Sequence, residues 1–195
     1  RRVLFRSGAG VVVAVAERNS DVNLKVDDNA SLSAQTVSLS SSDLGRSSAS
    51  GNGAAGGLLG AGNAVVVTAS DSSTVTSTSG NFVTFNAGSG GVTLSASALP
   101  NVSASAIGAA LGGAVGVGAS VATASGDTLV TAALGDDNSL LGNNGLTLAA
   151  DLKMLAGKDP GTANIVAKAI AGSGGLYFSA DRKSTRLNSS HPLDL

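Results

Sequence analysis

The residues of this sequence that could do chemistry are two acidic pairs set among turn-forming residues. Asp27-Asp28 and Asp136-Asp137 have the oxygen ligands to bind calcium and the carboxyls to act as acid and base. Both pairs are followed by Asn, which favours tight turns, and the calcium-binding repeat of β-rolls is missing. We therefore interpret both pairs as solvated turns and predict no metal site.

The sequence lacks the residues that catalytic triads, transition-metal sites and nucleotide-binding loops normally use. The sequence has no Cys, and its single His, His191, lies near the C-terminus. The Gly-x-Gly pairs at 8/10, 60/62 and 116/118 lack the third glycine of a dinucleotide-binding loop, and Gly157-Lys158 lacks the preceding glycine of a phosphate loop. We expect no catalytic residue, no cofactor-binding residue, no cofactor and no enzymatic activity.

Both ends of the chain resemble translated sequencing-library adapters. Residues 1–7 look like one adapter, and residues 181–195 look like the adapter used at the opposite end. The remaining segment, 8–180, holds 6 basic and 11 acidic residues, because half of the 12 Lys and Arg lie in the ends. It is mildly acidic and has no basic stripe, so we expect no nucleic-acid partner.

Internal repetition predicts how segment 8–180 is organised. Glycine pairs recur at 56–57, 112–113 and 174–175, and a second landmark recurs at 37–40, 92–95 and 146–149. The order of the landmarks is kept while their spacing drifts slightly from one copy to the next. Imperfect repeats of about 55 residues predict a stacked array with loop insertions.

Alternation of apolar and polar residues predicts strands within each repeat. Runs of four to six residues, such as 22–26 and 92–95, alternate and are rich in Val and Thr. Clusters of Gly, Asn, Asp and Ser separate them, including 70–73 and 135–138. We expect an all-β fold, with the aromatics Phe82, Phe85, Tyr177 and Phe178 as core residues.

The small-residue composition favours a parallel β-helix, or β-solenoid. Aromatic residues make up 3% and charged residues 13% of the chain. Ala, Val, Leu, Ser and Thr fit a narrow interior, and Gly suits the corners. We expect rungs of about 20 residues, and eight or nine rungs at ~4.8 Å would form a rod of roughly 40 Å. Val121 is expected to point into this interior.

Two segments also fit helices. Residues 149–157 contain good helix formers and a glycine stop, so a short helix is an alternative there. Residues 104–124 are uncharged, and three glycines stand four apart, as in a transmembrane glycine zipper. Serines lower the apolarity of that stretch, so we expect no stable membrane insertion.

Three passages, at 30–39, 116–122 and 145–152, resemble the repeat regions of large filamentous bacterial adhesins. These are the filamentous-haemagglutinin-like and leukotoxin-type exoproteins and the passengers of autotransporters. The resemblance implies a right-handed parallel β-helix that is exported across an outer membrane with a secretion partner. It also implies display at the cell surface, with an unknown host or bacterial receptor.

We therefore expect segment 8–180 to be a structural and adhesive shaft of a secreted or surface-attached exoprotein. One alternative is a fragment of a carbohydrate-active β-helix enzyme, which needs a cleft of acids and aromatics on one lateral face. A second alternative is a Gly/Ala-rich membrane-associated segment around 104–124.

Overall fold

The computed structural model describes residues 7–142, 145–152, 164–175 and, for the backbone, 178–189. Strands dominate it, and no helix occurs among these residues, so the all-β prediction is confirmed. The strands are β1 (Ser7–Val26), β2 (Ser31–Ala34), β3 (Val37–Asp43), β4 (Arg46–Gly57), β5 (Gly60–Ser79), β6 (Thr84–Ala87), β7 (Val92–Ala98), β8 (Asn101–Gly112), β9 (Val115–Ala133), β10 (Ser139–Leu141), β11 (Leu146–Leu152), β12 (Ile165–Gly174) and β13 (Phe178–Ser189).

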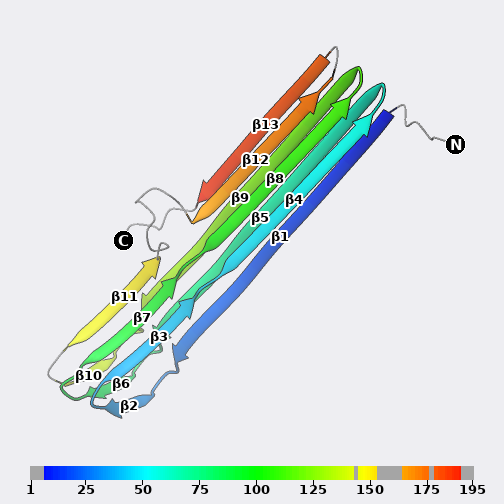
Figure 1. Ribbon diagram of the computed structural model, residues 1–195. Helices are drawn as coiled ribbons and strands as arrows, with labels where there is room; N and C mark the ends of the chain where they lie inside the picture. Colours follow the sequence, from blue (N-terminus) through cyan, green and yellow to red (C-terminus); the bar gives the residue numbers. More distant parts are fainter. Residues whose placement is uncertain (1–6, 143–144, 153–163, 176–177, 190–195) are drawn as a thin grey trace.

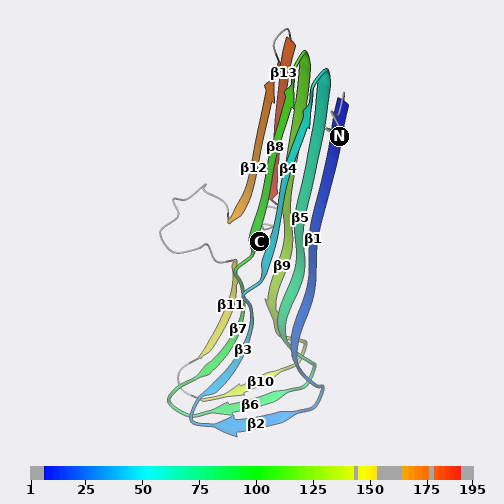
Figure 2. The same cartoon turned by 45° about the vertical axis from the view of Figure 1, so that its right-hand side comes forward.

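The chain follows the same path in each repeat. Strand β1 runs the length of the molecule, β2 crosses its lower end, β3 and β4 return, and β5 then lies beside β1 (Figures 1 and 2). Four sheets result, in the orders β1-β5-β9-β13, β2-β6-β10, β3-β7-β11 and β4-β8-β12, and every described ladder is parallel.

Each strand pairs with the equivalent strand one whole repeat away. Ser7 of β1 pairs with Gly60 of β5, and Gly60 pairs on its other side with Val115 of β9. The expected rung of about 20 residues is therefore wrong, and so is the estimate of eight or nine rungs. One whole repeat forms a single rung of four strands, because its strands are up to 20 residues long instead of four to six.

One repeated landmark aligns as the sequence indicates. Val37 pairs with Val92 and Leu39 with Leu94, and Leu146 and Leu148 pair with the same two residues from the other side. The glycine pairs align less well, since Gly57 pairs with Gly112 while Gly56 pairs with Leu111. The apolar landmark holds its register because its side chains fill the core, whereas glycine has no side chain to fix it.

Two local predictions are overridden by pairing between repeats. Residues 70–73, expected to form a turn, continue strand β5, where Asp71 and Ser73 are buried. The short helix considered as an alternative at 149–157 is wrong for Ala149–Leu152, because these residues of β11 pair with Ser95–Ala98 in strand β7. Residues 153–157 lie outside the described part of the chain.

The half of the molecule that carries the β4–β5 and β8–β9 turns has a thin core (Figure 2). Here the sheet of β1, β5 and β9 packs on the sheet of β4, β8 and β12 through small side chains. The buried cluster includes Val65, Val67, Ala104, Ala106 and Ala122. A Cβ at Gly118 would collide with the carbonyl oxygen of Gly172 in the opposite sheet, so the two backbones approach more closely than side chains allow.

The opposite end is wider, and larger side chains fill it. Strands β2, β6 and β10 close this end, and Phe85 and Leu94 are fully buried there with Val83. Phe85 confirms the expectation of a core aromatic. The same expectation is wrong for Phe82, which is 58% exposed at a corner with a φ of 56°. Tyr177 and the side chain of Phe178 lie outside the described part of the chain.

Val121 does not point inward as expected. Its neighbours Ser120 and Ala122 are buried, and Val121 pairs with Val66, which is itself exposed on the outer face. Side chains alternate between faces along a strand, so the residues inside β9 are those at even positions.

Candidate functional site

The acidic pairs lie at stacked corners, as the sequence indicates. The backbone N–H of Asn81 donates a hydrogen bond to Oδ1 of Asp28 (2.9 Å), and the backbone N–H of Asp136 donates one to Oδ1 of Asn81 (2.8 Å). Each corner side chain thus accepts a hydrogen bond from the corner of the next repeat. Asp137 and Asn29 adopt φ values near 60°, which Asn and Asp tolerate. The described residues contain no group of three or more potential metal ligands.

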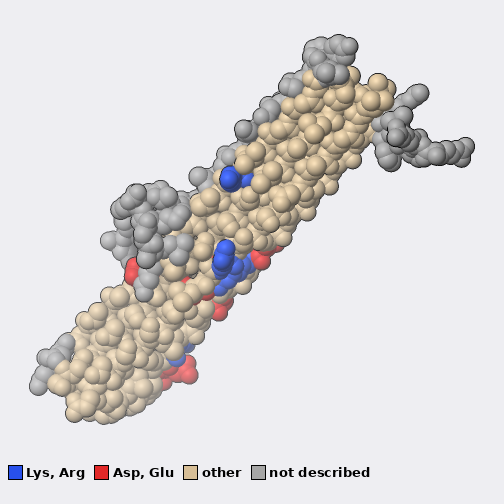
Figure 3. Space-filling model, in the orientation of Figure 1, with Lys and Arg blue, Asp and Glu red and all other residues tan. Residues whose placement is uncertain are grey.

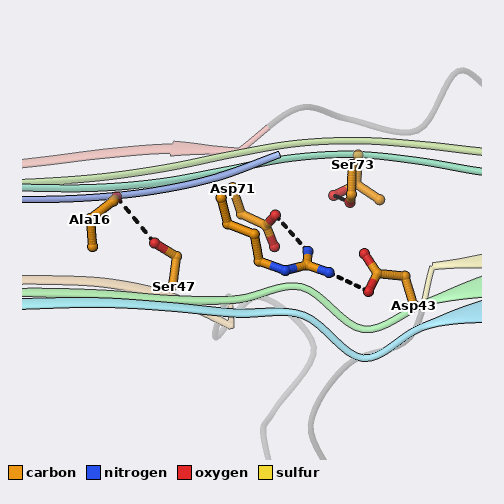
Figure 4. A network of polar contacts seen from close by, with 7 residues as sticks. Ala16, Asp43, Ser47, Asp71 and Ser73 are labelled. Carbon is orange, nitrogen blue, oxygen red and sulfur yellow. Dashed lines mark hydrogen bonds and ion pairs between the residues drawn. The ribbon is translucent and has the colours of Figure 1, made fainter. Parts of the chain in front are cut away.

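A buried ionic cluster forms where strand β3 ends, and we call Arg18, Asp43 and Asp71 the arginine cluster. Arg18 Nη1 lies 2.8 Å from Asp71 Oδ1, and Nη2 lies 2.5 Å from Asp43 Oδ1 (Figure 4). Arg18 and Asp71 are register partners in β1 and β5, whereas Asp43 belongs to β3 of the facing sheet. The cluster therefore joins two repeats and both layers of the molecule.

Burial strengthens the attraction between these charges but also removes them from water, which costs free energy. The side chain of Asp71 is fully buried, that of Asp43 is 9% exposed and that of Arg18 is 23% exposed. The hydrogen bond that Arg18 donates to Asp43 raises the pKa of Arg18, and burial opposes the rise. The hydrogen bond that Arg18 donates to Asp71 and the negative charges of both carboxylates raise the pKa further. Because the pKa of Arg18 is raised in the folded state, this contribution to stability is complete at neutral pH and is lost only as the pH rises through the strongly alkaline range in which arginine titrates.

The surroundings show why the cluster does not extend into the third repeat. At the register of Arg18 and Asp71, strand β9 has Gly126, and a Cβ there would lie 2.7 Å from Ile165 Cδ1. In the third repeat, the apolar side chain of Ile165 therefore occupies the position that Arg18 and Asp71 occupy in the first two repeats. Gly45, beside Asp43, leaves the room into which the Arg18 guanidinium extends.

A second buried polar site lies in the thin core. The amide of Asn63 is buried, and neither its nitrogen nor its oxygen has a hydrogen-bond partner among the described residues. It occupies the space left by Gly53 and Gly108, whose added Cβ atoms would come within 3.0 Å of it. Such an amide costs stability. The hydroxyl of Ser120 lies close by, since a Cβ at Gly108 would be 2.8 Å from Ser120 Oγ and 3.0 Å from Asn63 Nδ2, and this hydroxyl also has no hydrogen-bond partner among the described residues.

Neither site has the parts of a catalytic centre. An arginine with a raised pKa does not transfer protons near neutral pH, and Arg18 already occupies the cation position between the two carboxylates. A small pocket at the wide end, about 20 Å³, is lined by Ala87, Gly91, Val92, Leu140, Leu141, Gly142 and Gly145. This lining has no ionisable side chain.

The Gly-x-Gly pairs lie inside strands instead of phosphate-binding loops. They belong to β1, β5 and β9, and those of β5 are shifted by one position, so that Gly60 faces Ser7 and Gly62 faces Ala9. Gly157-Lys158 and His191 lie outside the described residues.

The arginine cluster was not predicted, although one signal for it exists. Arg18 and Asp71 stand one full repeat apart in the sequence, so aligned repeats place opposite charges side by side. Asp43 has no such signal, because only the packing of the two layers brings it to Arg18. The chain matches none of the protein families, curated proteins or solved structures with which it was compared.

Proposed function

We propose that residues 8–180 are a β-solenoid segment of a large bacterial exoprotein, secreted or attached to the cell surface, with a structural and adhesive role. The observation that carries the proposal is the pairing of each strand with its equivalent in the next repeat. All nine ladders of the described chain have this form. Such pairing lets repeats be added without limit, as in a stacked array.

The geometry changes the expected mechanical role. A repeat of about 55 residues adds one rung, which is about 4.8 Å in the stacking direction. The segment therefore extends only a short way along the stacking direction for its number of residues. Its strands of 20 residues instead span about 66 Å. The structural role that fits this shape is a broad face that gains one strand per repeat, and an adhesive role would use that face for multivalent contact.

The carbohydrate-active alternative gains little support from the described surface. A lyase or hydrolase needs carboxylates, basic groups and sugar-stacking aromatics in one cleft. The two most buried carboxylates, Asp43 and Asp71, are both paired with Arg18 inside the molecule, and the one exposed aromatic of the described residues is Phe82.

The membrane-associated alternative concerns residues 104–124. The glycine-zipper helix does not form, because these residues belong to β8, the following turn and β9. Within the described residues, no helix has the length and apolarity needed to cross a membrane.

A chain with one added repeat tests the solenoid fold and the adhesive role separately. A second copy of residues 60–114 inserted after position 114 should fold and thicken the molecule by about 4.8 Å, measured by small-angle scattering. Beads coated with the longer protein should also adhere to host or bacterial cells more strongly than beads with the parent chain, because contacts multiply. An insertion that unfolds the chain would contradict the solenoid. Folded chains that adhere to no cells at either length would contradict the adhesive role.

A further inference from the structure

One long edge of the molecule is formed by strand β1. This strand pairs with β5 on one side and with no strand on the other side within the described chain (Figure 1). An edge strand of a parallel sheet turns alternate backbone N–H and C=O groups away from its partner, and these groups can bind another strand. We call residues 7–16, the half of β1 without charged residues, the open edge.

The open edge lacks the features that usually prevent an edge strand from pairing. It contains no proline and no charge, and its ladder with β5 is continuous, without a bulge. The other half of β1 does carry charges, at Glu17, Arg18, Asp21 and Lys25. In the space-filling view, where β1 forms the right-hand margin, charged side chains begin near the middle and the upper part of that margin is free of them (Figure 3).

The side chains of the open edge are half covered, because only one strand lies beside them. Its inward residues Val12, Ala14 and Ala16 are only partly buried against the core cluster of the thin half. Their register partners in β5, which has a strand on each side, are at most 1% exposed. On the outer face, Val13 is 65% exposed and its partner Val66 is 39% exposed. A strand added to the open edge would therefore complete the burial that β5 already has.

The facing sheet selects a strand with small inward residues. A Cβ at Gly8 would collide with the carbonyl oxygen of Gly56, so the two layers leave no room here for large inward side chains. Residues 115–126 of β9 meet this requirement, because they are uncharged and their inward residues are Gly, Ser and Ala. This segment already pairs in parallel with β5, and the same register on β1 would align its first residue with Ser7.

A second copy of the whole chain fits the open edge less well. Copies stacked end to end would bring β13 of one against β1 of the next. The register of β13 would then place the charged residues 181–183 beside residues 10–12. Charges on an edge strand oppose further pairing. The composition of the open edge therefore favours an uncharged strand as its partner.

We propose that the open edge is a strand-addition site for a strand of another repeat, meaning an extended, uncharged segment with small residues at alternate positions. The segment adds in parallel, as β5 does on the other side of β1. This inference deepens the proposed function and rests on its solenoid part, because it assigns a partner to the free edge of the solenoid. It does not depend on adhesion.

Binding of a synthetic peptide of residues 115–126 to the 195-residue chain tests the proposal. At saturating peptide, we expect the fast-exchanging backbone amides of residues 7–16 to become protected from hydrogen exchange. Residues 19–26, beyond the end of the aligned peptide, should keep their exchange rates.

Two N-methylated peptides are the matched controls, one methylated at every odd residue and the other at every even residue. A strand in a parallel ladder uses alternate amides for one partner. One of these peptides should therefore bind as the parent peptide does, and the other should bind more weakly by about tenfold or more, because it loses several hydrogen bonds.

Three outcomes would overturn the proposal. The first is unchanged exchange at the open edge at every peptide concentration. The second is equal binding of both methylated peptides, which would indicate apolar contact without a ladder. The third is protection of residues 165–174 of β12 instead, which would place the partner at the opposite end of the stack. If a chain with an inserted repeat folds although no peptide binds, the solenoid stands and the strand-addition site alone is contradicted.

Discussion

At the residue scale, the arginine cluster has the greatest consequence for stability. Arg18 bridges carboxylates from both layers, and Asp71 is fully buried. A buried pair contributes little relative to apolar residues of the same size, but removing one partner leaves a charge without compensation. The cluster therefore holds the two layers in one arrangement more than it adds to the free energy of folding.

Replacing Arg18 should reveal this asymmetry. Arg18→Met is expected to lower the free energy of unfolding by about 3–5 kcal/mol, because it strands two carboxylates. The triple variant Arg18→Met/Asp43→Leu/Asp71→Leu should recover most of that loss. Urea denaturation at neutral pH measures both, since the charge of Arg18 is constant there. A single variant as stable as the parent chain would contradict the inferred cluster.

A second prediction at this scale concerns Phe82. Its φ of 56° is shared by Asn29 and Asp137 at the equivalent corners, and a bulky side chain is strained in that region. Phe82→Asn should raise the free energy of unfolding by about 1 kcal/mol. The buried Phe85 is the matched contrast, and Phe85→Ala should cost about 3–5 kcal/mol. Thermal unfolding of both variants is the measurement, and a destabilised Phe82→Asn would refute the corner assignment.

At the scale of elements, glycine content sets how closely the two layers of the thin half approach. Inward glycines such as Gly118 bring backbone against backbone, whereas outward glycines such as Gly62 meet open space. The same residue type in the same Gly-x-Gly spacing therefore has opposite roles in β9 and β5. The register between repeats decides which role each glycine takes.

Alanine substitution distinguishes the two roles. Gly118→Ala should destabilise the chain by about 1–3 kcal/mol, because its Cβ meets the Gly172 carbonyl across the interior. Gly62→Ala should be neutral or slightly stabilising, since alanine loses less conformational entropy in a strand. Denaturant unfolding compares them. Equal changes in stability at both positions would contradict the placement of Gly118 in the interior and of Gly62 on the outer face.

At the scale of the whole molecule, the strand order predicts which backbone groups are protected. Strand β5 is paired on both sides, by β1 and β9, whereas β1 is paired on one side within the described chain. Parallel edge strands turn alternate amides away from their partner.

Hydrogen exchange should report that difference. Amides of β5 are expected to exchange slowest, and those of β1 should alternate between slow and fast. Residue-resolved exchange at neutral pH is the measurement. Uniform protection along β1 would mean that another segment covers that edge.

The sequence by itself determined the class of the fold and part of its register. Alternation and composition indicated strands with a small-residue core, and the landmark at residues 37–40, 92–95 and 146–149 aligned because inward apolar side chains tolerate no slip. Corner residues such as Asp28 and Asp136 were also recognisable, since Asn, Asp and Gly suit turns wherever the chain bends.

Only the tertiary structure decided how long each strand continues and which residues meet across the interior. Local propensity placed a turn at residues 70–73 and ended strands after a few residues, but pairing with two neighbouring repeats keeps that segment extended and gives Asp71 a partner in Arg18. The approach of Asp43 to Arg18, the exposure of Phe82 and the outward orientation of Val121 likewise depend on where the two sheets lie in space. Contacts between residues far apart in the chain carry that information, because their energies depend on packing geometry that no local pattern encodes.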